Sequence, residues 1–156
     1  MTITIIFIIL TFFFMEGVAW FMHKYIMHGF LWYFHEDHHK PNQEHFFEKN
    51  DFFFLIFAIP SIILCYLGTY YPNLYYLLGI GLGITVYGFA YFMVHDVFIH
   101  QRFKLLTRTD NIYFRAIRKA HKVHHKKMGK EDGECFGMLW VPISYFKEAW
   151  KSGKKK

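Results

Sequence analysis

Residues 2–28 read TITIIFIILTFFFMEGVAWFMHKYIMH, an apolar run that ends in two histidines separated by four residues. Up to Met22 the run holds one charged residue, Glu16, and it is long enough to cross a hydrocarbon layer of about 30 Å at about 1.5 Å per helical residue. No basic residue precedes Lys24 and no small-residue cleavage site follows, so the pattern does not indicate a secretory signal peptide. We therefore expect Thr2–Met22 to be a retained transmembrane helix.

Two further uncharged runs of spanning length follow, Phe52–Tyr71 and Leu74–Val94. The Pro-Asn pair between them is a turn signal, so the two runs are expected to form a helical hairpin. No strand or βαβ unit accompanies the glycines of the third run, so we predict no nucleotide cofactor site there. Small residues instead let neighbouring helices approach closely. The glycines expected at such packing positions are Gly79, Gly81, Gly83 and Gly88.

The composition and the distribution of charge agree with a membrane protein. Of the 156 residues, 54% are hydrophobic and 22% are aromatic, which is too apolar for a soluble domain of this size. Every Lys and Arg lies either between the first two runs or after the third, so the positive-inside rule places both regions in the cytoplasm. The net charge of +6 is then explained by anionic lipid and does not indicate binding to nucleic acid.

The segment Phe136–Trp150 is aromatic but short, and it contains Pro142. We expect it to lie at the membrane interface or to re-enter the membrane, with a fourth span as the alternative. The predicted fold class is an all-α integral membrane protein with three transmembrane helices, or four in the alternative.

Ten of the eleven histidines fall into four tight groups, two with the spacing HX4H and two with HX2HH. The groups alternate, so each half of the chain has a span that ends in HX4H and is followed by HX2HH. The topology places all four groups on the cytoplasmic side, where they can converge. They are His23 and His28; His35, His38 and His39; His95 and His100; and His121, His124 and His125.

The spacing within each group has geometric consequences. On an ideal helix, positions i, i+3 and i+4 fall within an arc of about 100°, so the histidines of one HX2HH can point to one place. Positions i and i+5 differ by about 140°, so each HX4H pair must straddle two metals or lie where its helix is distorted. Ten imidazoles exceed the roughly four to six positions of one ion, which favours a two-metal centre over a single ion. His45 belongs to no group and is expected to be an ordinary interfacial residue.

A competing motif overlaps the second group. Residues 35–39, HEDHH, also satisfy HExxH, the zinc protease signature. In that interpretation His35 and His39 bind zinc and Glu36 is the general base of an intramembrane metalloprotease. It leaves His38 and the other three groups without a role, and so short a motif arises easily within a histidine-rich run.

The run Glu16–His39, together with His95-Asp96…His100 and His121…His125, closely resembles bacterial β-carotene hydroxylases, the β-ionone-ring 3-hydroxylases of the membrane fatty acid hydroxylase superfamily. The similarity covers most of the chain, and all four histidine motifs are intact. It implies one membrane-embedded domain over residues 1–156 and a non-haem di-iron oxygenase whose ligands are the ten grouped histidines. It also implies hydroxylation of β-carotene at ring carbon 3, giving β-cryptoxanthin and then zeaxanthin.

The resemblance further implies two iron ions, O2 as co-substrate and electrons from outside the chain, which has no flavin, nicotinamide or iron–sulfur signature. A reduced ferredoxin-type donor with its reductase is typically acidic and would suit the basic cytoplasmic face. The carotenoid is expected in the bilayer of a bacterial inner membrane. A carotenoid ketolase, or a lipid or sterol hydroxylase or desaturase, stays an alternative because the product depends on substrate placement and not on the ligands.

Two carboxylates near the histidines have two interpretations each. Asp96, beside His95, either orients an imidazole from outside the ligand shell or is solvated at a helix end. Glu16 in the first span is either functional, as intramembrane carboxylates are by default, or a satisfied structural hydrogen-bonding group. Beyond the metal ligands, no catalytic residue is predicted.

Overall fold

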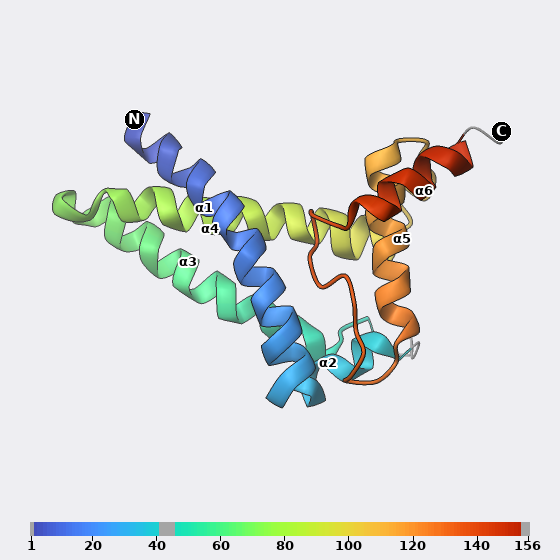
Figure 1. The fold of residues 1–156 in the computed structure, drawn as a ribbon. Coiled ribbons are helices and arrows are strands. Elements are labelled where there is room, and N and C mark those ends of the chain that lie inside the picture. The colour runs from blue at the N-terminus through green and yellow to red at the C-terminus, as the bar shows by residue number, and fades with distance from the viewer. Residues whose placement is uncertain (1, 41–45, 154–156) are drawn as a thin grey trace.

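The computed structural model describes residues 2–40 and 46–153, and every regular element within these ranges is a helix. The longest are α1 (Thr2–Phe21), α3 (Phe52–Tyr70) and α4 (Tyr76–Phe92), which pack together in Figure 1. The expected all-α fold is thus confirmed for the described residues.

Three helical stretches are long and apolar enough to cross a membrane, which confirms the three expected spans. They are Thr2–Phe30, Lys49–Tyr70 and Tyr76–Ile99, of 29, 22 and 24 residues. At about 1.5 Å per residue, each can cross a hydrocarbon layer of about 30 Å. The first and third stretches run past their expected ends because π-helical turns that carry the histidine pairs continue the apolar helices.

The second and third spans form the expected hairpin, which is closed by the short 3₁₀ helix η3 (Pro72–Leu74) (Figure 1). The first half of α1 lies beside this tip, where the ring centroids of Phe7 and Tyr76 are 6.1 Å apart. The start of the first span and the hairpin tip are therefore at the same end of the bundle.

Glycine lets α4 approach both neighbouring helices closely. A Cβ on Gly81 would lie 2.6 Å from Sγ of Cys65 in α3, and a Cβ on Gly79 would lie 2.8 Å from a backbone oxygen of α1. Gly83 makes a similar approach to α1. The expectation is wrong for Gly88, where an added Cβ would meet nothing within 4 Å.

At the end of the bundle opposite the tip, α5 (Ile112–Lys126) packs against α6 (Ile143–Gly153) (Figure 1). An ion pair between Lys119 and Glu148 joins the two helices. Since α6 has 11 residues, it extends only about 16 Å and is too short to span a bilayer. The described residues therefore do not support the four-span alternative, and the exposed Ile143 fits a helix at the interface.

Candidate metal centre

Both HX4H pairs lie at π-helical turns, η1 (Met22–Phe30) and η4 (Met93–Ile99). In a π-helix residue i bonds to residue i+5, so side chains five residues apart lie closer to one face than on an ideal α-helix. The backbone N–H of His100 donates to the carbonyl oxygen of His95 in this way, at 2.8 Å. The helices are therefore distorted, as one of the two predicted possibilities required, and each pair points to one side.

The chain turns back on itself after the first pair. Gly29 has a non-helical backbone (φ −102°, ψ −125°), and the next helix, α2 (Trp32–His39), starts in a new direction. This turn folds the first HX2HH toward the first HX4H, so that residues from both motifs meet.

Five imidazoles form a first histidine group, in which one ring nitrogen of each lies within 4.8 Å of the others. The Nε2 atom of His35 is 3.1 Å from Nε2 of His23 and 3.2 Å from Nε2 of His39. On the other side of the group, Nε2 of His28 is 3.3 Å from Nε2 of His124. The first group consists of His23, His28, His35, His39 and His124.

The second histidine group meets the same criterion and consists of His38, His95, His100 and His121. The Nε2 atoms of His38 and His95 are 3.0 Å apart, and those of His100 and His121 are 2.8 Å apart.

His125 lies beside the second group, with ring centroids 4.6 Å from His121 and 4.7 Å from His100. Its ring also stacks on His39 of the first group at 4.5 Å. Its Nε2 atom is buried and has no hydrogen-bond partner within the part of the chain that the structure describes. All ten grouped histidines are thus brought to one place.

The two groups exchange one histidine between the halves of the chain. His38, the middle residue of the first HX2HH, joins the second group, and His124, its counterpart on α5, joins the first. The expectation that the histidines of one HX2HH share a single target is therefore wrong. On a helix, position i+4 lies about 40° to one side of position i and position i+3 about 60° to the other, so the three rings divide between two targets.

Burial favours the neutral form of four of these imidazoles, all outside the spans. It lowers the pKa of His35 to about 2, of His124 to about 3 and of His39 to about 4, and repulsion from neighbouring imidazoles adds to the shift. The same causes lower the pKa of His125 to about 2. Neutral imidazole is the form that binds a metal, so the centre is ready to do so at pH 7.

Neutral oxygens fix the rings of the first group from outside. Four Nδ1–H groups donate to backbone carbonyls of residues 127–136, and His35 donates to the Asn50 side-chain oxygen at 2.7 Å. Because a carbonyl only accepts, each Nδ1 carries the proton and each Nε2 presents a free lone pair to the group, which suits a metal. The carbonyl pairs are His23 with Phe136 (3.0 Å), His28 with Lys130 (3.1 Å), His39 with Lys127 (3.1 Å) and His124 with Glu134 (2.8 Å).

Carboxylates take this place in the second group. The Nδ1 atom of His38 is 2.7 Å from Glu48, and that of His95 is 3.2 Å from Asp96, whose side chain is 15% exposed. Asp96 therefore contacts an imidazole and is not a solvated residue. Glu48 was missed in the sequence because no motif links this part of the α2–α3 connection to the histidines.

The segment of residues 127–140, here called the closing loop, is anchored by Glu16. One carboxylate oxygen of Glu16 accepts three backbone N–H groups, and the other accepts the Tyr87 hydroxyl at 2.7 Å. Of the two interpretations of Glu16, the satisfied structural group is the one observed, and it holds the loop whose carbonyls orient the first group. The three donors are Met138 (2.9 Å), Leu139 (2.8 Å) and Trp140 (3.1 Å).

The residues of the competing HExxH motif separate in space. The carboxylate of Glu36 pairs with Nζ of Lys40 at 3.0 Å on the surface, while His35 and His39 join three further histidines. The ungrouped His45 lies outside the described residues.

Comparisons with known proteins agree with this arrangement. A family model described as fatty acid hydroxylase matches residues 8–144. A protein named beta-carotene hydroxylase from Pantoea ananas is 43% identical over 128 residues, which cover 82% of this chain and 71% of the relative. One of the same name from Pseudescherichia vulneris is 40% identical over 141 residues, 90% of this chain and 78% of the relative. The chloroplastic beta-carotene 3-hydroxylase of Gentiana lutea is 42% identical over 130 residues, which cover 82% of this chain and 40% of the relative. No solved structure matches the chain.

Proposed function

The chain belongs to the fatty acid hydroxylase family, and it is 40–43% identical to two bacterial proteins named beta-carotene hydroxylase. We therefore propose that it hydroxylates carbon 3 of the carotenoid β-ionone ring. β-Carotene would give β-cryptoxanthin and then zeaxanthin. The names of the relatives support a carotenoid as substrate and hydroxylation as reaction. The observation that carries the chemistry is the meeting of four histidine motifs in two adjacent buried groups.

The donor set fits two iron ions. Neutral Nε2 lone pairs converge in each group. The Nε2 of His125, which has no hydrogen-bond partner among residues 2–40 and 46–153, gives the second group a fifth donor. A bound, reduced iron pair would supply the activation of O2 that breaking an unactivated C–H bond needs. One ion would be held by the first group, which consists of His23, His28, His35, His39 and His124. The other would be held by the second group and its neighbour, namely His38, His95, His100, His121 and His125.

The rest of the chain fixes and shields these ligands. The closing loop holds four Nδ1 protons in place through backbone carbonyls, so the rings keep their orientation without moving on metal binding. Burial of the imidazoles excludes bulk water from the centre, as a strongly oxidising reaction needs. The substrate, an insoluble polyene, would enter from the bilayer.

The proposed electron donor is a reduced ferredoxin-type protein with its reductase. The exposed Lys127 and Lys130 lie directly over the first group, because their own backbone carbonyls accept from His39 and His28. An acidic donor would thus dock within a residue or two of the imidazoles.

The chain would form one domain, residues 1–156, of a bacterial inner membrane, with both histidine groups on the cytoplasmic side. The positive-inside rule supports this orientation, since every Lys and Arg, like the four histidine motifs, lies either between the first two apolar runs of the sequence or after the third. The net charge of +6 is then accounted for by anionic lipid, and we propose no nucleic acid partner.

The test is pigment analysis in cells that accumulate β-carotene. Expression of the chain is expected to yield products heavier by one and two oxygens that co-elute with β-cryptoxanthin and zeaxanthin. Ketone products would indicate a carotenoid ketolase instead. Unchanged β-carotene, with the protein present in the membrane, would contradict the proposal and direct attention to lipid or sterol substrates.

A further inference from the structure

The two histidine groups differ in the charge that their outer ring nitrogens meet. All five Nδ1 atoms of the first group contact neutral oxygens, namely four backbone carbonyls and the amide of Asn50. In the second group, His38 and His95 instead contact the carboxylates of Glu48 and Asp96, at 2.7 and 3.2 Å.

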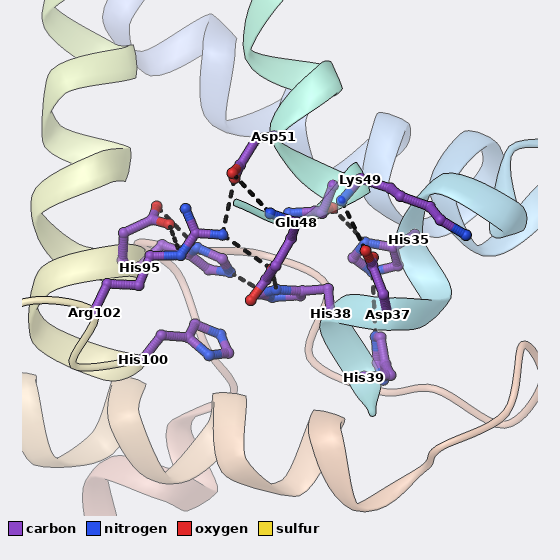
Figure 2. A network of polar contacts seen from close by, with 12 residues as sticks. His35, Asp37, His38, His39, Glu48, Lys49, Asp51, His95, His100 and Arg102 are labelled. Carbon is purple, nitrogen blue, oxygen red and sulfur yellow. Dashed lines mark hydrogen bonds and ion pairs between the residues drawn. The ribbon is translucent and has the colours of Figure 1, made fainter. Parts of the chain in front are cut away.

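Arg102 ties these carboxylates together. Figure 2 shows its guanidinium between Glu48 and Asp51. Its Nη2 atom lies 3.1 Å from Glu48 and 2.9 Å from Asp51, and its Nε atom lies 3.3 Å from Asp96. The guanidinium side chain is only 15% exposed, so these pairs are shielded from solvent more than surface ion pairs are. A rigid fork of donors is well suited to hold several carboxylates in fixed positions.

The backbone beside the second group is also fixed. Glu48 caps the 3₁₀ helix η2 (Lys49–Asp51), and its own backbone N–H donates to Asp51 at 3.1 Å. The same short helix carries Asn50, which contacts His35 of the first group. Glu48 and Asn50, two residues apart in the chain, thus present a charged acceptor to one group and a neutral acceptor to the other.

From this asymmetry we infer that Glu48, Asp96 and Arg102 are positioning residues that make the second group the stronger of two unequal metal sites. A carboxylate that accepts a hydrogen bond from Nδ1–H fixes the ring and raises the electron density at Nε2, whereas a backbone carbonyl fixes the ring with no net charge. The second group therefore binds a divalent ion more tightly and keeps it when the first has lost its own. This inference rests on the proposed metal centre.

Cobalt titration of the full chain tests the inference without any activity measurement. The protein is purified in lipid nanodiscs, stripped with a chelator and titrated with Co²⁺, and both visible absorption and cobalt per chain are followed. Two binding steps of unequal affinity are expected for the wild type. Outer-shell substitutions typically change metal affinity by about 10- to 100-fold, which sets the size of the expected gap.

Two isosteric substitutions are expected to change the affinity for cobalt in opposite directions, each at a different site. Glu48→Gln keeps a hydrogen-bond acceptor for His38 but removes the charge, so it is expected to weaken the tighter step about 10- to 100-fold and leave the weaker step unchanged. Asn50→Asp places a carboxylate on His35 and is expected to strengthen the weaker step alone. Asp96→Asn is a second variant of the tighter site, with the same expected direction as Glu48→Gln.

The outcomes separate this inference from the proposed function. A wild-type chain that binds no cobalt would overturn both. Two equal steps in the wild type, or equal weakening of both steps in folded Glu48→Gln, would overturn the inference and leave the metal centre standing. Should Glu48→Gln not fold, the wild-type steps and the gain in Asn50→Asp still decide the matter.

Discussion

His124 is fully buried, and both of its ring nitrogens have defined partners. Nδ1 donates to the carbonyl oxygen of Glu134 at 2.8 Å, and Nε2 faces His28 from the other half of the chain. It is the one residue of α5 that joins the first group, so it couples the position of α5 to the histidines of η1 and α2.

His124→Ala is therefore expected to abolish hydroxylation while the protein still inserts into the membrane, because the site loses a ligand and not a span. The assay is zeaxanthin formed per membrane-inserted chain in cells that accumulate β-carotene, together with metal bound per purified chain. Full product yield from this variant would remove His124 from the centre.

Glu36→Gln is the matched substitution beside the same groups. Its carboxylate pairs with Lys40 on the surface, so hydroxylation is expected to stay close to wild type in the same cells. A complete loss of activity in Glu36→Gln, with the protein still inserted, would favour the HExxH interpretation over the two-group centre.

At the scale of elements, the packing of α4 against α3 gives a paired test. A Cβ on Gly81 would lie 2.6 Å from Sγ of Cys65 and 2.8 Å from the backbone oxygen of Ser61, whereas one on Gly88 meets nothing within 4 Å. Gly81→Ala is expected to destabilise the protein by about 1–3 kcal/mol, as overpacking does, and Gly88→Ala to have little effect. Thermal unfolding in detergent checks this, and equal midpoints for the two variants would contradict the described hairpin.

The closing loop gives a second test at this scale. Glu16→Ala leaves three backbone N–H groups without their acceptor. The buried one, of Met138, costs about 1–3 kcal/mol, and the change should release the loop from the first group. Faster hydrogen exchange at residues 138–140 is expected, with weaker metal binding. Glu16→Gln keeps one acceptor oxygen and should lie between Glu16→Ala and wild type. Unchanged exchange in Glu16→Ala would show that the loop is held elsewhere.

The elements that could be predicted from the sequence are those indicated by the type and order of their side chains. The three spans follow from uncharged apolar runs, and the hairpin follows from Pro72 and Asn73 between two of them. The HX4H spacing predicts a distorted helix only as one of two possibilities, and it does not predict that the distortion is a π-helical turn. The closing loop had no signal, because it acts through backbone carbonyls, which every residue has. Its link to Glu16 spans more than 120 residues of sequence, between Glu16 and Met138 at the nearest donor.

At the scale of the whole molecule, the buried histidines make the stability of the metal-free protein depend on pH. In the folded chain the pKa of His39 is lowered to about 4 and that of His124 to about 3, below the ordinary value near 6.5 of the unfolded chain. Between these values the unfolded chain binds more protons, so the free energy of unfolding falls as the pH falls.

Above about pH 6.5, these histidines are thus expected to make a constant contribution to the free energy of unfolding of the metal-free protein. Below that pH, the free energy of unfolding should fall by up to about 1.4 kcal/mol per pH unit for each such histidine. Thermal midpoints of the stripped protein, measured from pH 7.5 to 4.5, check the sign. Midpoints that rise on acidification would contradict the burial of neutral imidazoles.

The alternation of HX4H and HX2HH in the sequence predicted a centre shared by the two halves of the chain, and the structure brings all ten histidines together. It did not predict that His38 and His124 exchange between the halves. That outcome depends on the directions in which α2 and α5 present positions i+3 and i+4, and these directions are set by the turn at Gly29 and by packing. The sequence alone specifies neither.

We proposed above that ten histidines hold two metal ions in two groups. The most direct measurement is a crystal structure of the iron-loaded protein with anomalous scattering recorded at the iron edge. We predict two anomalous peaks, one enclosed by the first group with His124 among its ligands and one enclosed by the second with His38. A single peak, or a peak beside Glu36, would contradict a centre of two metal ions held by the two histidine groups.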